Sequence, residues 1–190
     1  MMTQLFTERL VLREFRESDW RAVHEILVDP LVTQYTPAGS SSEEESEEAT
    51  RLLVNDRSSD PPRHSFAITL RPLDPNAESA VIGVCFLALP PDKLRQGDLG
   101  FLLARRYWGR GYATEAARAV LRYGFQELGL HRIYATCRPA NVASSHVLEK
   151  LGMRREGHLV EHRWFKGRWR DSLLYAILDR EWQALTSTAQ

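Results

Sequence analysis

The 190-residue chain predicts a single α/β domain spanning residues 1–190. Its centre is a mixed, mostly antiparallel sheet of about six to seven strands with helices on both faces. The predicted elements run strand, two helices, three strands, helix, strand, helix and two strands. The strand–helix–strand unit at 98–137 implies a parallel pair, because a crossover helix brings the chain back in the same direction. No repeat or long linker divides the chain, and its length suits one core.

Composition narrows the class of protein. Hydrophobic residues make up 43% of the chain and charged residues 26%, which excludes a disordered chain, a collagen-like repeat and a disulfide mini-protein. The formal net charge is zero, which argues against a protein built mainly to coat nucleic acid. The halves differ, since residues 1–95 carry 10 basic and 16 acidic groups and residues 96–190 carry 15 and 9. An anionic partner would therefore contact the second half.

The first half begins with a strand, LVLREF, at 10–15. Ser18 is expected to cap a helix that Asp29-Pro30 ends, because its apolar residues follow a helical period. Ser42 and Glu45 form the pattern of a capping box for a helix through about residue 55. The acidic run at the start of that helix is expected to be a solvated first turn that the helix dipole favours.

Three strands follow, HSFAITL at 64–70, AVIGVCFLA at 80–88 and DLGFLL at 98–103. The first two are separated by RPLDPNAES, a polar turn that contains proline. An alanine-rich helix comes after the third strand, with apolar residues at helical spacing. Gly129 is placed to end it, because glycine adopts the left-handed conformation of a C-terminal cap.

The last third of the chain contains a strand, a helix and a hairpin. RIYATC at 132–137 is a short apolar strand. Asn141 caps the next helix, which Gly152 ends. Two final strands, near 157–165 and 169–178, flank a turn at Lys166-Gly167.

Cysteine usage and the N-terminus predict a cytoplasmic location. Cys85 and Cys137 lie in apolar runs, so two buried reduced thiols are favoured over a disulfide. The N-terminus lacks the basic start, apolar stretch and cleavage site of a signal peptide. No stretch approaches the ~18 apolar residues of a membrane span, so no membrane partner is expected.

The turn RRYWGRGYAT links the strand at 98–103 to the following helix. Gly109 and Gly111 let the backbone turn tightly and bring several N–H groups to one point. The helix N-terminus adds a partial positive charge, and three arginines add full charges, so the turn suits a pyrophosphate or a similar anion. The spacing is neither a Walker pattern nor a complete dinucleotide fingerprint. The three arginines are Arg105, Arg106 and Arg110.

Four segments together resemble one family. Arg106-x-x-Gly109-x-Gly111-x-Ala113 resembles the acyl-CoA signature of the Gcn5-related N-acetyltransferases (GNAT). Two further segments are similar to the branch of ribosomal-protein N-terminal (alanine/serine) acetyltransferases. One is DLGFLL followed by YWGRGYATEA, and the other is Asn141, three residues before Ser144, followed by LEKLGM. The opening TERLVLREFRESD and the ending EGHLVEHRWFKGRWRDSLLYAIL resemble its first strand and its final hairpin. The resemblance covers nearly the whole chain and implies one acetyltransferase domain with a splayed central pair of parallel strands.

The resemblance also implies that acetyl-CoA is the cosubstrate. Backbone N–H groups of the glycine turn would hold its pyrophosphate, and the strand before the turn would bind the pantetheine arm. A bulge would splay this strand from the one at 132–137, and an N–H of Leu102 or Leu103 would polarise the thioester carbonyl. The residues implied in binding are Phe101, Leu102, Leu103, Arg106, Trp108, Gly109, Arg110, Gly111, Tyr112, Ala113, Thr114, Asn141 and Ser144. Asn141 would bind the arm as well as cap its helix.

The implied reaction is direct attack of a primary amine on acetyl-CoA in a ternary complex. Asp98 is the candidate base, where this branch commonly has glutamate, and the alternative is a solvated strand-edge carboxylate. Ser144 is the candidate acid for the departing thiolate, with water as its competitor. Many relatives have a tyrosine for this role, at the position of Leu148. Ser145 is adjacent to Ser144 but is expected to point about 100° away around the helix.

Several alternatives remain at this stage. His158 and His162 share a strand face but lack a third ligand, so no metal is expected. The basic and aromatic hairpin at 163–170 matches an RNA-binding module, although a turn with aromatic and arginine faces is the commoner arrangement. A non-catalytic acyl-CoA sensor is the other alternative. The expected acceptor is a protein N-terminus or a small amine. Contact with nucleic acid is expected only if the protein is ribosome-associated. The chain is expected to be a monomer or a homodimer.

Overall fold

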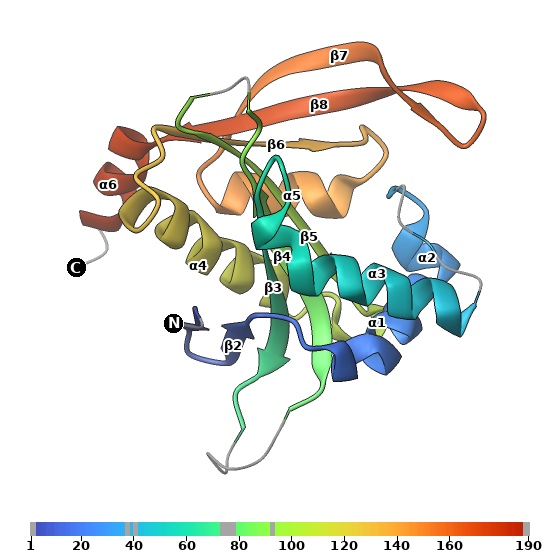
Figure 1. The fold of residues 1–190 in the computed structure, drawn as a ribbon. Coiled ribbons are helices and arrows are strands. Elements are labelled where there is room, and N and C mark those ends of the chain that lie inside the picture. Colours follow the sequence, from blue (N-terminus) through green and yellow to red (C-terminus); the bar gives the residue numbers. More distant parts are fainter. Residues whose placement is uncertain (1–2, 37–38, 40–41, 73–78, 92–93, 188–190) are drawn as a thin grey trace.

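The computed structural model describes residues 3–36, 39, 42–72, 79–91 and 94–187. Eight strands form one sheet in the order β1-β2-β3-β4-β5-β6-β8-β7 (Figure 1). The strands are β1 (Leu5–Phe6), β2 (Leu10–Arg13), β3 (Arg63–Leu70), β4 (Val81–Ala88), β5 (Gln96–Leu103), β6 (Arg132–Cys137), β7 (Arg154–Phe165) and β8 (Arg168–Leu178). All neighbours are antiparallel except β5 and β6. The predicted mixed, mostly antiparallel sheet is confirmed.

The parallel pair is open at one end. β5 and β6 pair over only three positions, of which Asp98↔Tyr134 is the last. Beyond it, β5 stays in register with β4 to Leu103, and β6 stays paired with β8 to Cys137. The splayed pair is therefore confirmed. The expected bulge is wrong, because the β4–β5 register contains no shift over the residues that the structure describes.

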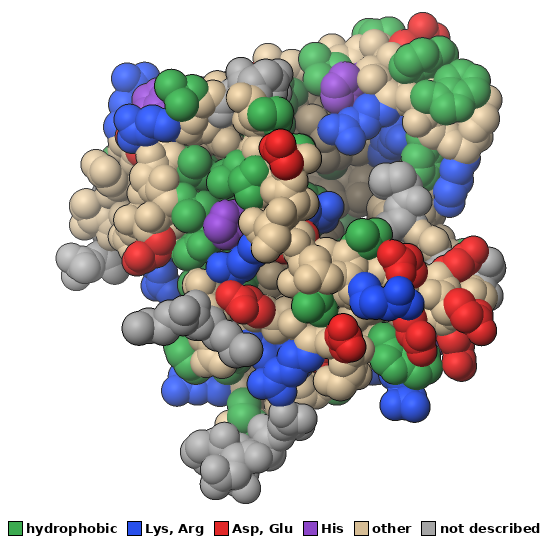
Figure 2. All heavy atoms as spheres, viewed as in Figure 1, with side chains coloured by type: hydrophobic (Ala, Val, Ile, Leu, Met, Phe, Trp, Pro, Cys, Tyr) green, Lys and Arg blue, Asp and Glu red, His purple; other side chains and the backbone are tan. Residues whose placement is uncertain are grey.

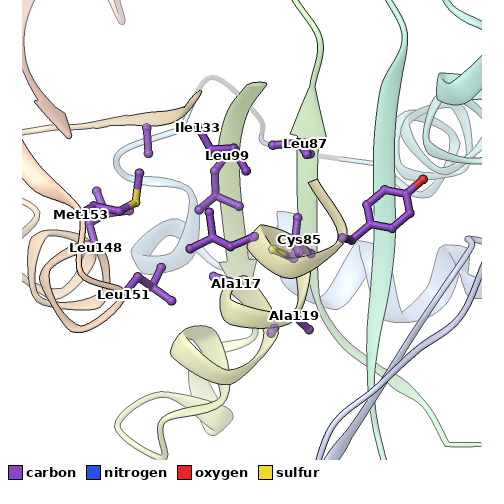
Figure 3. Close-up of a cluster of buried hydrophobic side chains, with 14 of the residues drawn as sticks. Cys85, Leu87, Leu99, Ala117, Ala119, Ile133, Leu148, Leu151 and Met153 are labelled. Atoms are coloured by element: carbon purple, nitrogen blue, oxygen red, sulfur yellow. The ribbon is translucent and has the colours of Figure 1, made fainter. Parts of the chain in front are cut away.

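Helices cover both faces of the sheet, as predicted. The helices are α1 (Trp20–Leu27), α2 (Pro30–Thr33), α3 (Glu43–Asn55), α4 (Tyr112–Gln126), α5 (Val142–Lys150) and α6 (Asp179–Ser187). The larger apolar cluster joins α4, α5 and Trp182 of α6 to the strands. Figure 3 shows Ala117 of α4 near Cys85, and Leu148 of α5 beside Leu151 and Met153. A second cluster joins α1 and α3 to the other face.

Most predicted helix ends are confirmed. The side chain of Ser42 accepts a hydrogen bond from the Glu45 N–H at 3.2 Å, and α3 begins at the next residue. Asn141 accepts from the Ser144 N–H at 3.1 Å and caps α5. Gly129 and Gly152 have φ angles of +61° and +81° after their helices. These caps were predictable because each depends on one side chain or one glycine.

The capping role predicted for Ser18 is wrong. Ser18 lies inside a short 3₁₀ turn at Glu17–Asp19. The Asp19 carboxylate instead accepts from the Arg16 N–H at 2.8 Å and pairs with Arg13, also at 2.8 Å. A carboxylate that binds both a guanidinium and a backbone N–H outcompetes a serine hydroxyl.

Three elements were not predicted. β1 has only two residues, and its pairing with β2 is a tertiary property. Pro30 was expected only to end a helix, but it also begins α2, with Asp29 as the N-cap that accepts from Leu31 N–H at 3.0 Å. α6 follows β8 directly, and Trp182 anchors it to the core. Most of the predicted turn at 71–79 lies outside the described residues.

The two cysteines are buried and free, as predicted. Burial raises the pKa of both thiols, so both stay protonated near neutral pH. Within the described ranges, none of the helices has the length and the apolar character needed to cross a membrane.

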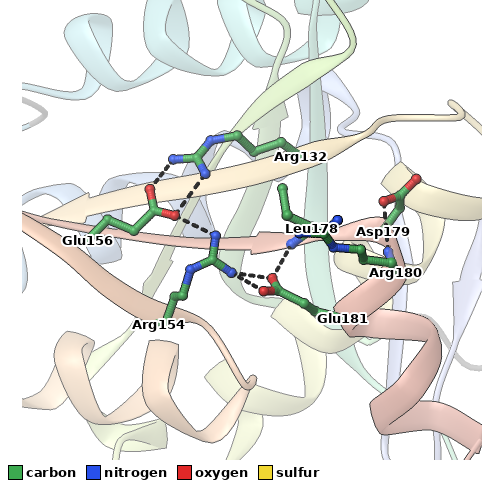
Figure 4. Close-up of polar contacts among 7 residues, drawn as sticks. All are labelled: Arg132, Arg154, Glu156, Leu178, Asp179, Arg180 and Glu181. Carbon is green, nitrogen blue, oxygen red and sulfur yellow. Dashed lines mark hydrogen bonds and ion pairs between the residues drawn. The ribbon is translucent and has the colours of Figure 1, made fainter.

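A network of ion pairs joins β6, β7 and α6 (Figure 4). Glu156 binds two guanidinium groups, that of Arg132 at 3.0 Å and that of Arg154 at 2.7 Å. Arg154 also pairs with Glu181, which accepts from the Leu178 N–H at 2.8 Å. Hydrogen bonds from Arg132 lower the pKa of Glu156. The network fixes the sheet edge beside α6.

We predict that Gly83→Ala destabilises the fold and disturbs the open end of β5. The new Cβ would lie 2.4 Å from the Leu102 carbonyl oxygen, a backbone atom that cannot rotate away. Such overpacking costs about 2 kcal/mol, which for this length lowers Tm by about 4–8 °C. Gly157→Ala is the matched control, because its Cβ meets nothing within 4 Å. Equal melting temperatures for the two variants would contradict the packing.

The Glu156 network predicts a pH-dependent stability difference. The pKa of Glu156 is lowered in the folded state, so its contribution is complete above the ordinary glutamate pKa of 4.5 and is lost as pH falls through the folded pKa. Glu156→Gln should cost about 1 kcal/mol at pH 7 and much less near pH 3, measured by urea unfolding. Glu127→Gln, at an exposed carboxylate, is the control. A Glu156→Gln deficit that is constant with pH would rule out the charge as its source.

Candidate functional site

The gap between β5 and β6 presents unpaired backbone groups. The Ala104 N–H donates to the Ile82 carbonyl at 2.9 Å. Because backbone direction alternates along a strand, the N–H and C=O of Leu102 also point toward β4, whereas those of Phe101 and Leu103 point into the gap. Of the two residues predicted to polarise a carbonyl there, the register favours Leu103.

The glycine turn closes this gap at the C-terminal end of β5. Gly109 and Gly111 have φ angles of +72° and +79°, which only glycine adopts without strain. Gly111 is the N-cap of α4, so the N–H groups of the first helical turn have no acceptor within the helix. These donors belong to Tyr112, Ala113 and Thr114.

Trp108 does not contribute as expected. Its N–H donates to the Arg105 carbonyl at 3.1 Å and so is occupied within the turn. Its indole Nε1 donates to the Leu103 carbonyl at 2.8 Å. Trp108 thus caps the end of β5 with its side chain, which the resemblance did not indicate.

The arginines of the turn are also less free than the sequence implied. Arg105 pairs with Asp29 at 3.0 Å, and Arg106 pairs with Glu25 at 2.9 Å. These pairs tie the turn to α1 and α2. Arg110 is exposed. The positive field at the turn therefore comes chiefly from the helix N-terminus and Arg110.

Arg9 is a site residue that the motifs did not reveal. Its guanidinium pairs with Glu115 at 2.6 Å and donates to the Arg110 carbonyl at 3.0 Å. It also lies 4.7 Å from the ring centroid of Tyr112. Although burial raises the pKa of Glu115, bonds from Thr7 and Arg9 outweigh it and lower this pKa. Arg9 thus fastens the start of β2 to the first turn of α4.

A hollow of about 360 Å³ opens beside the glycine turn. Arg118 and Lys150 bring positive charge to it, from the second turn of α4 and the end of α5. Arg118 follows Thr114 by four residues, so it lies on the same helix face. That spacing was the sequence signal for it. The residues that line the hollow are Glu8, Gly111, Thr114, Glu115, Arg118 and Lys150.

Asp98 is half-buried at the point where β5 and β6 separate. Ala88 of β4 pairs with Arg63 of β3 on one side and with Asp98 of β5 on the other. The side chains of Arg63 and Asp98 therefore lie on the same face of the sheet. Burial lowers the pKa of Arg63, and the carboxylates of Asp56 and Asp98 offset part of that shift. The Arg63 guanidinium also lies 3.5 Å from the Phe86 ring centroid. The carboxylate of Asp98 therefore lies within electrostatic range of Arg63.

The start of α5 brings two serines to different surroundings. Ser145 is buried, and its hydroxyl lies 3.4 Å from the Cys137 sulfur. Ser144 is half-buried on a different side of the helix, as predicted. Its backbone N–H binds the Asn141 side-chain oxygen, so the capping role of Asn141 is confirmed.

A tyrosine reaches this region from β8. The buried Tyr175 hydroxyl donates to Glu149 of α5 at 3.1 Å, and burial raises the pKa of this hydroxyl. Tyr175 pairs with Ala135 of β6, and Ala135 directly follows Tyr134, the last residue of β6 that pairs with β5. Leu148, where many relatives have tyrosine, is buried in the core.

The two histidines of β7 do not share a regular strand face. The register shifts between Leu159 and Arg163, and Glu161 has a φ of +48°. His158 pairs with Asp171 at 2.6 Å. Across the ranges that the structure describes, no group of three His, Cys, Asp or Glu side chains surrounds a common point.

The fold and the glycine turn together define an acyl-CoA-dependent N-acetyltransferase. A family model described as an acetyltransferase (GNAT) domain matches residues 9–154. The chain therefore belongs to the GNAT family, and it is an acetyl-CoA-dependent N-acetyltransferase.

Individual relatives agree with this assignment. An uncharacterised N-acetyltransferase, YnaD of Bacillus subtilis (strain 168), is 38% identical over 93% of this chain and 97% of its own. The [ribosomal protein uS5]-alanine N-acetyltransferase of Escherichia coli (strain K12) is 32% identical over 57% of this chain and 56% of its own. The structure of a Vibrio cholerae spermidine N-acetyltransferase with CoA and spermine has a TM-score of 0.76 at 26% identity, covering 93% of this chain and 99% of its own. None of these relatives is named a sensor or an RNA-binding protein.

We predict that Gly111→Glu weakens CoA binding at least tenfold. The substitution puts a carboxylate beside the α4 N-terminus and strains a backbone with a φ of +79°. Gly129→Glu is the matched control, because it carries the same charge and a φ of +61° after the other end of α4. Calorimetric titration of CoA into both folded variants is the measurement. Equal affinities would contradict the placement of the pyrophosphate.

Proposed function

We propose that this enzyme acetylates the α-amino group of a peptide or protein N-terminus. The observation that carries the proposal is the setting of Asp98, the carboxylate at the branch point of β5 and β6, which faces Arg63. Aspartate is one methylene shorter than the glutamate that this branch commonly has here, which limits its reach toward the amine. An α-amine has a pKa of about 8 and is roughly a tenth neutral at pH 7, whereas lysine has a pKa of about 10.4. An α-amine therefore demands less of such a base.

The cosubstrate is held at three places in this proposal. The glycine turn, with donors from Gly109 to Thr114, binds the pyrophosphate. Arg118 and Lys150, at the hollow beside the turn, bind the remaining phosphate charge of CoA. The pantetheine arm extends β5 through the backbone groups of Phe101 and Leu103, and Asn141 meets it from α5.

The reaction then follows from the groups along the gap. The neutral amine attacks the thioester carbon, and the Leu103 N–H stabilises the oxygen that gains charge. Asp98, directly or through a water, accepts a proton from the attacking nitrogen. The carbon–sulfur bond breaks, and Ser144 gives the departing thiolate a proton while it takes one from water. Asp98 returns its proton to solvent before the next turnover. The products are an N-acetyl amide and free CoA.

The named relatives all acetylate amines, but the amine differs from one relative to another. The Escherichia coli relative is named for the alanine of a ribosomal protein, and the Vibrio cholerae structure contains spermine. A polyamine is therefore the competing acceptor. Its amines need a stronger base, and its positive charges would meet the arginines of the β7–β8 hairpin.

An amine panel, read out as thiol release at several pH values, tests the proposal. We expect kcat/KM for a peptide α-amine to rise with pH and level off near pH 8, whereas a polyamine profile would rise toward pH 10, at about the pKa of each amine. Asp98→Asn should lower kcat about 10²-fold and leave CoA affinity unchanged. Asp98→Glu, the residue common in this branch, should retain activity. Faster turnover of spermine than of every α-amine peptide would overturn the acceptor class.

A further inference from the structure

Three arginines of the β7–β8 hairpin lie on one of its faces, and Arg138 packs against the same face. Arg163 lies directly opposite Arg170, and Arg168 lies opposite Phe165. Arg138, which follows β6, places its guanidinium 4.5 Å from the Phe165 ring centroid. Trp164 and Trp169 pack edge to face on the other side of the hairpin, with ring centroids 5.6 Å apart. The predicted separation of arginine and aromatic faces is confirmed, with Phe165 on the arginine side.

These arginines repel one another. Burial lowers the pKa of Arg138, and the charges of Arg170 and Arg163 lower it further. Burial also lowers the pKa of Arg170, with a second contribution from Arg168. The Arg170 Nε is buried without a hydrogen-bond partner in the described part of the chain. Like charges directly opposite on two strands are destabilising, so this arrangement costs stability in the free protein.

Eight other arginines of the chain have carboxylate partners. Ion pairs with Asp or Glu are formed by Arg9, Arg13, Arg51, Arg57, Arg105, Arg106, Arg132 and Arg154. Within the described ranges, the four arginines of the hairpin face form no ion pair, and Asp171 beside them already binds His158. Four guanidinium groups without a carboxylate partner among the described residues thus lie together on this face.

The arginine face lies at the mouth of the gap. Arg138 directly follows the open end of β6. The Lys166 ammonium donates to the Thr33 carbonyl at 3.5 Å, and the Tyr35 hydroxyl donates to the Ala140 carbonyl at 3.3 Å, so α2 and the residues after it close the other side. In Figure 2, Lys and Arg side chains gather beneath the hairpin beside a hollow.

We infer that Arg138, Arg163, Arg168 and Arg170 form a subsite for carboxylate groups on the acceptor molecule. The inference rests on the proposed function, because a peptide that offers its α-amine to the gap carries its anionic groups as carboxylates. Guanidinium groups bind carboxylates in a two-pronged geometry that a lysine cannot match. Two sources supply this chemistry, namely the acidic side chains of a protein N-terminus and the terminal carboxylate of a short peptide.

The test compares C-terminally amidated hexapeptides that begin with Ser-Ala and continue with either Glu or Gln at the third and fourth positions. A free Ser-Ala dipeptide and its amide form the second arm. We expect the acidic hexapeptide to show a KM about tenfold below that of the neutral one. Arg138→Gln and Arg170→Gln should each remove most of this preference without lowering kcat for the neutral peptide. If the enzyme prefers the free dipeptide to its amide but does not distinguish the two hexapeptides, the subsite binds the terminal carboxylate of a short peptide.

Controls separate this inference from misfolding and from the proposed function. Arg170→Gln should not lower Tm, because it relieves repulsion, and Arg180→Gln, on α6, should keep the preference. Fluorescence anisotropy of labelled hexapeptides measures the subsite even if no acceptor is turned over. Equal affinity for acidic and neutral peptides in both arms, or a preference that survives both variants, would overturn the inference. Tighter binding of a single-stranded RNA than of the acidic peptide would also overturn it.

Discussion

The structure depends on hydrogen bonds that β5 and β6 do not make. After Asp98↔Tyr134 the two strands separate in the middle of an eight-stranded sheet. Unpaired backbone groups inside a fold are costly unless something satisfies them. The indole Nε1 of Trp108 donates a hydrogen bond to the Leu103 carbonyl. The N–H groups along the gap are then left for a cosubstrate. In the proposed complex, the amides of a pantetheine arm complete the ladder that the chain leaves open.

The opening is held by what lies outside it. β5 keeps its register with β4, and β6 keeps its register with β8, so each strand is fixed on its far side. Gly83 lets β4 approach β5 closely, because any Cβ there would meet the Leu102 carbonyl. Arg9 fastens the start of β2 to α4. The gap is therefore a property of the whole sheet, and a change distant in sequence can alter it.

The sequence predicted those features that depend on a few neighbouring residues. Asn141, Ser42 and Gly111 each set a helix end through one side chain or one left-handed backbone, and a motif records that directly. The partners of Arg9 and Arg106 could not be predicted, because they lie 106 and 81 residues away along the chain. β1 is too short to carry a period, and only its pairing with β2 defines it. The bulge failed for another reason, since strands can part by losing pairs on one side without inserting a residue.

The formal neutrality of the chain conceals how its charges are arranged. Eight arginines are matched by a nearby carboxylate, and several of these pairs join elements, as Arg106 with Glu25 joins the glycine turn to α1. Four arginines without such a partner among the described residues gather where the gap opens, at Arg138, Arg163, Arg168 and Arg170. Pairing lets a charge stabilise the fold, whereas leaving charges together makes binding of an opposite charge more favourable by relieving repulsion. A protein with zero net charge can thus hold one strongly positive surface, at the place where the acceptor is proposed to enter.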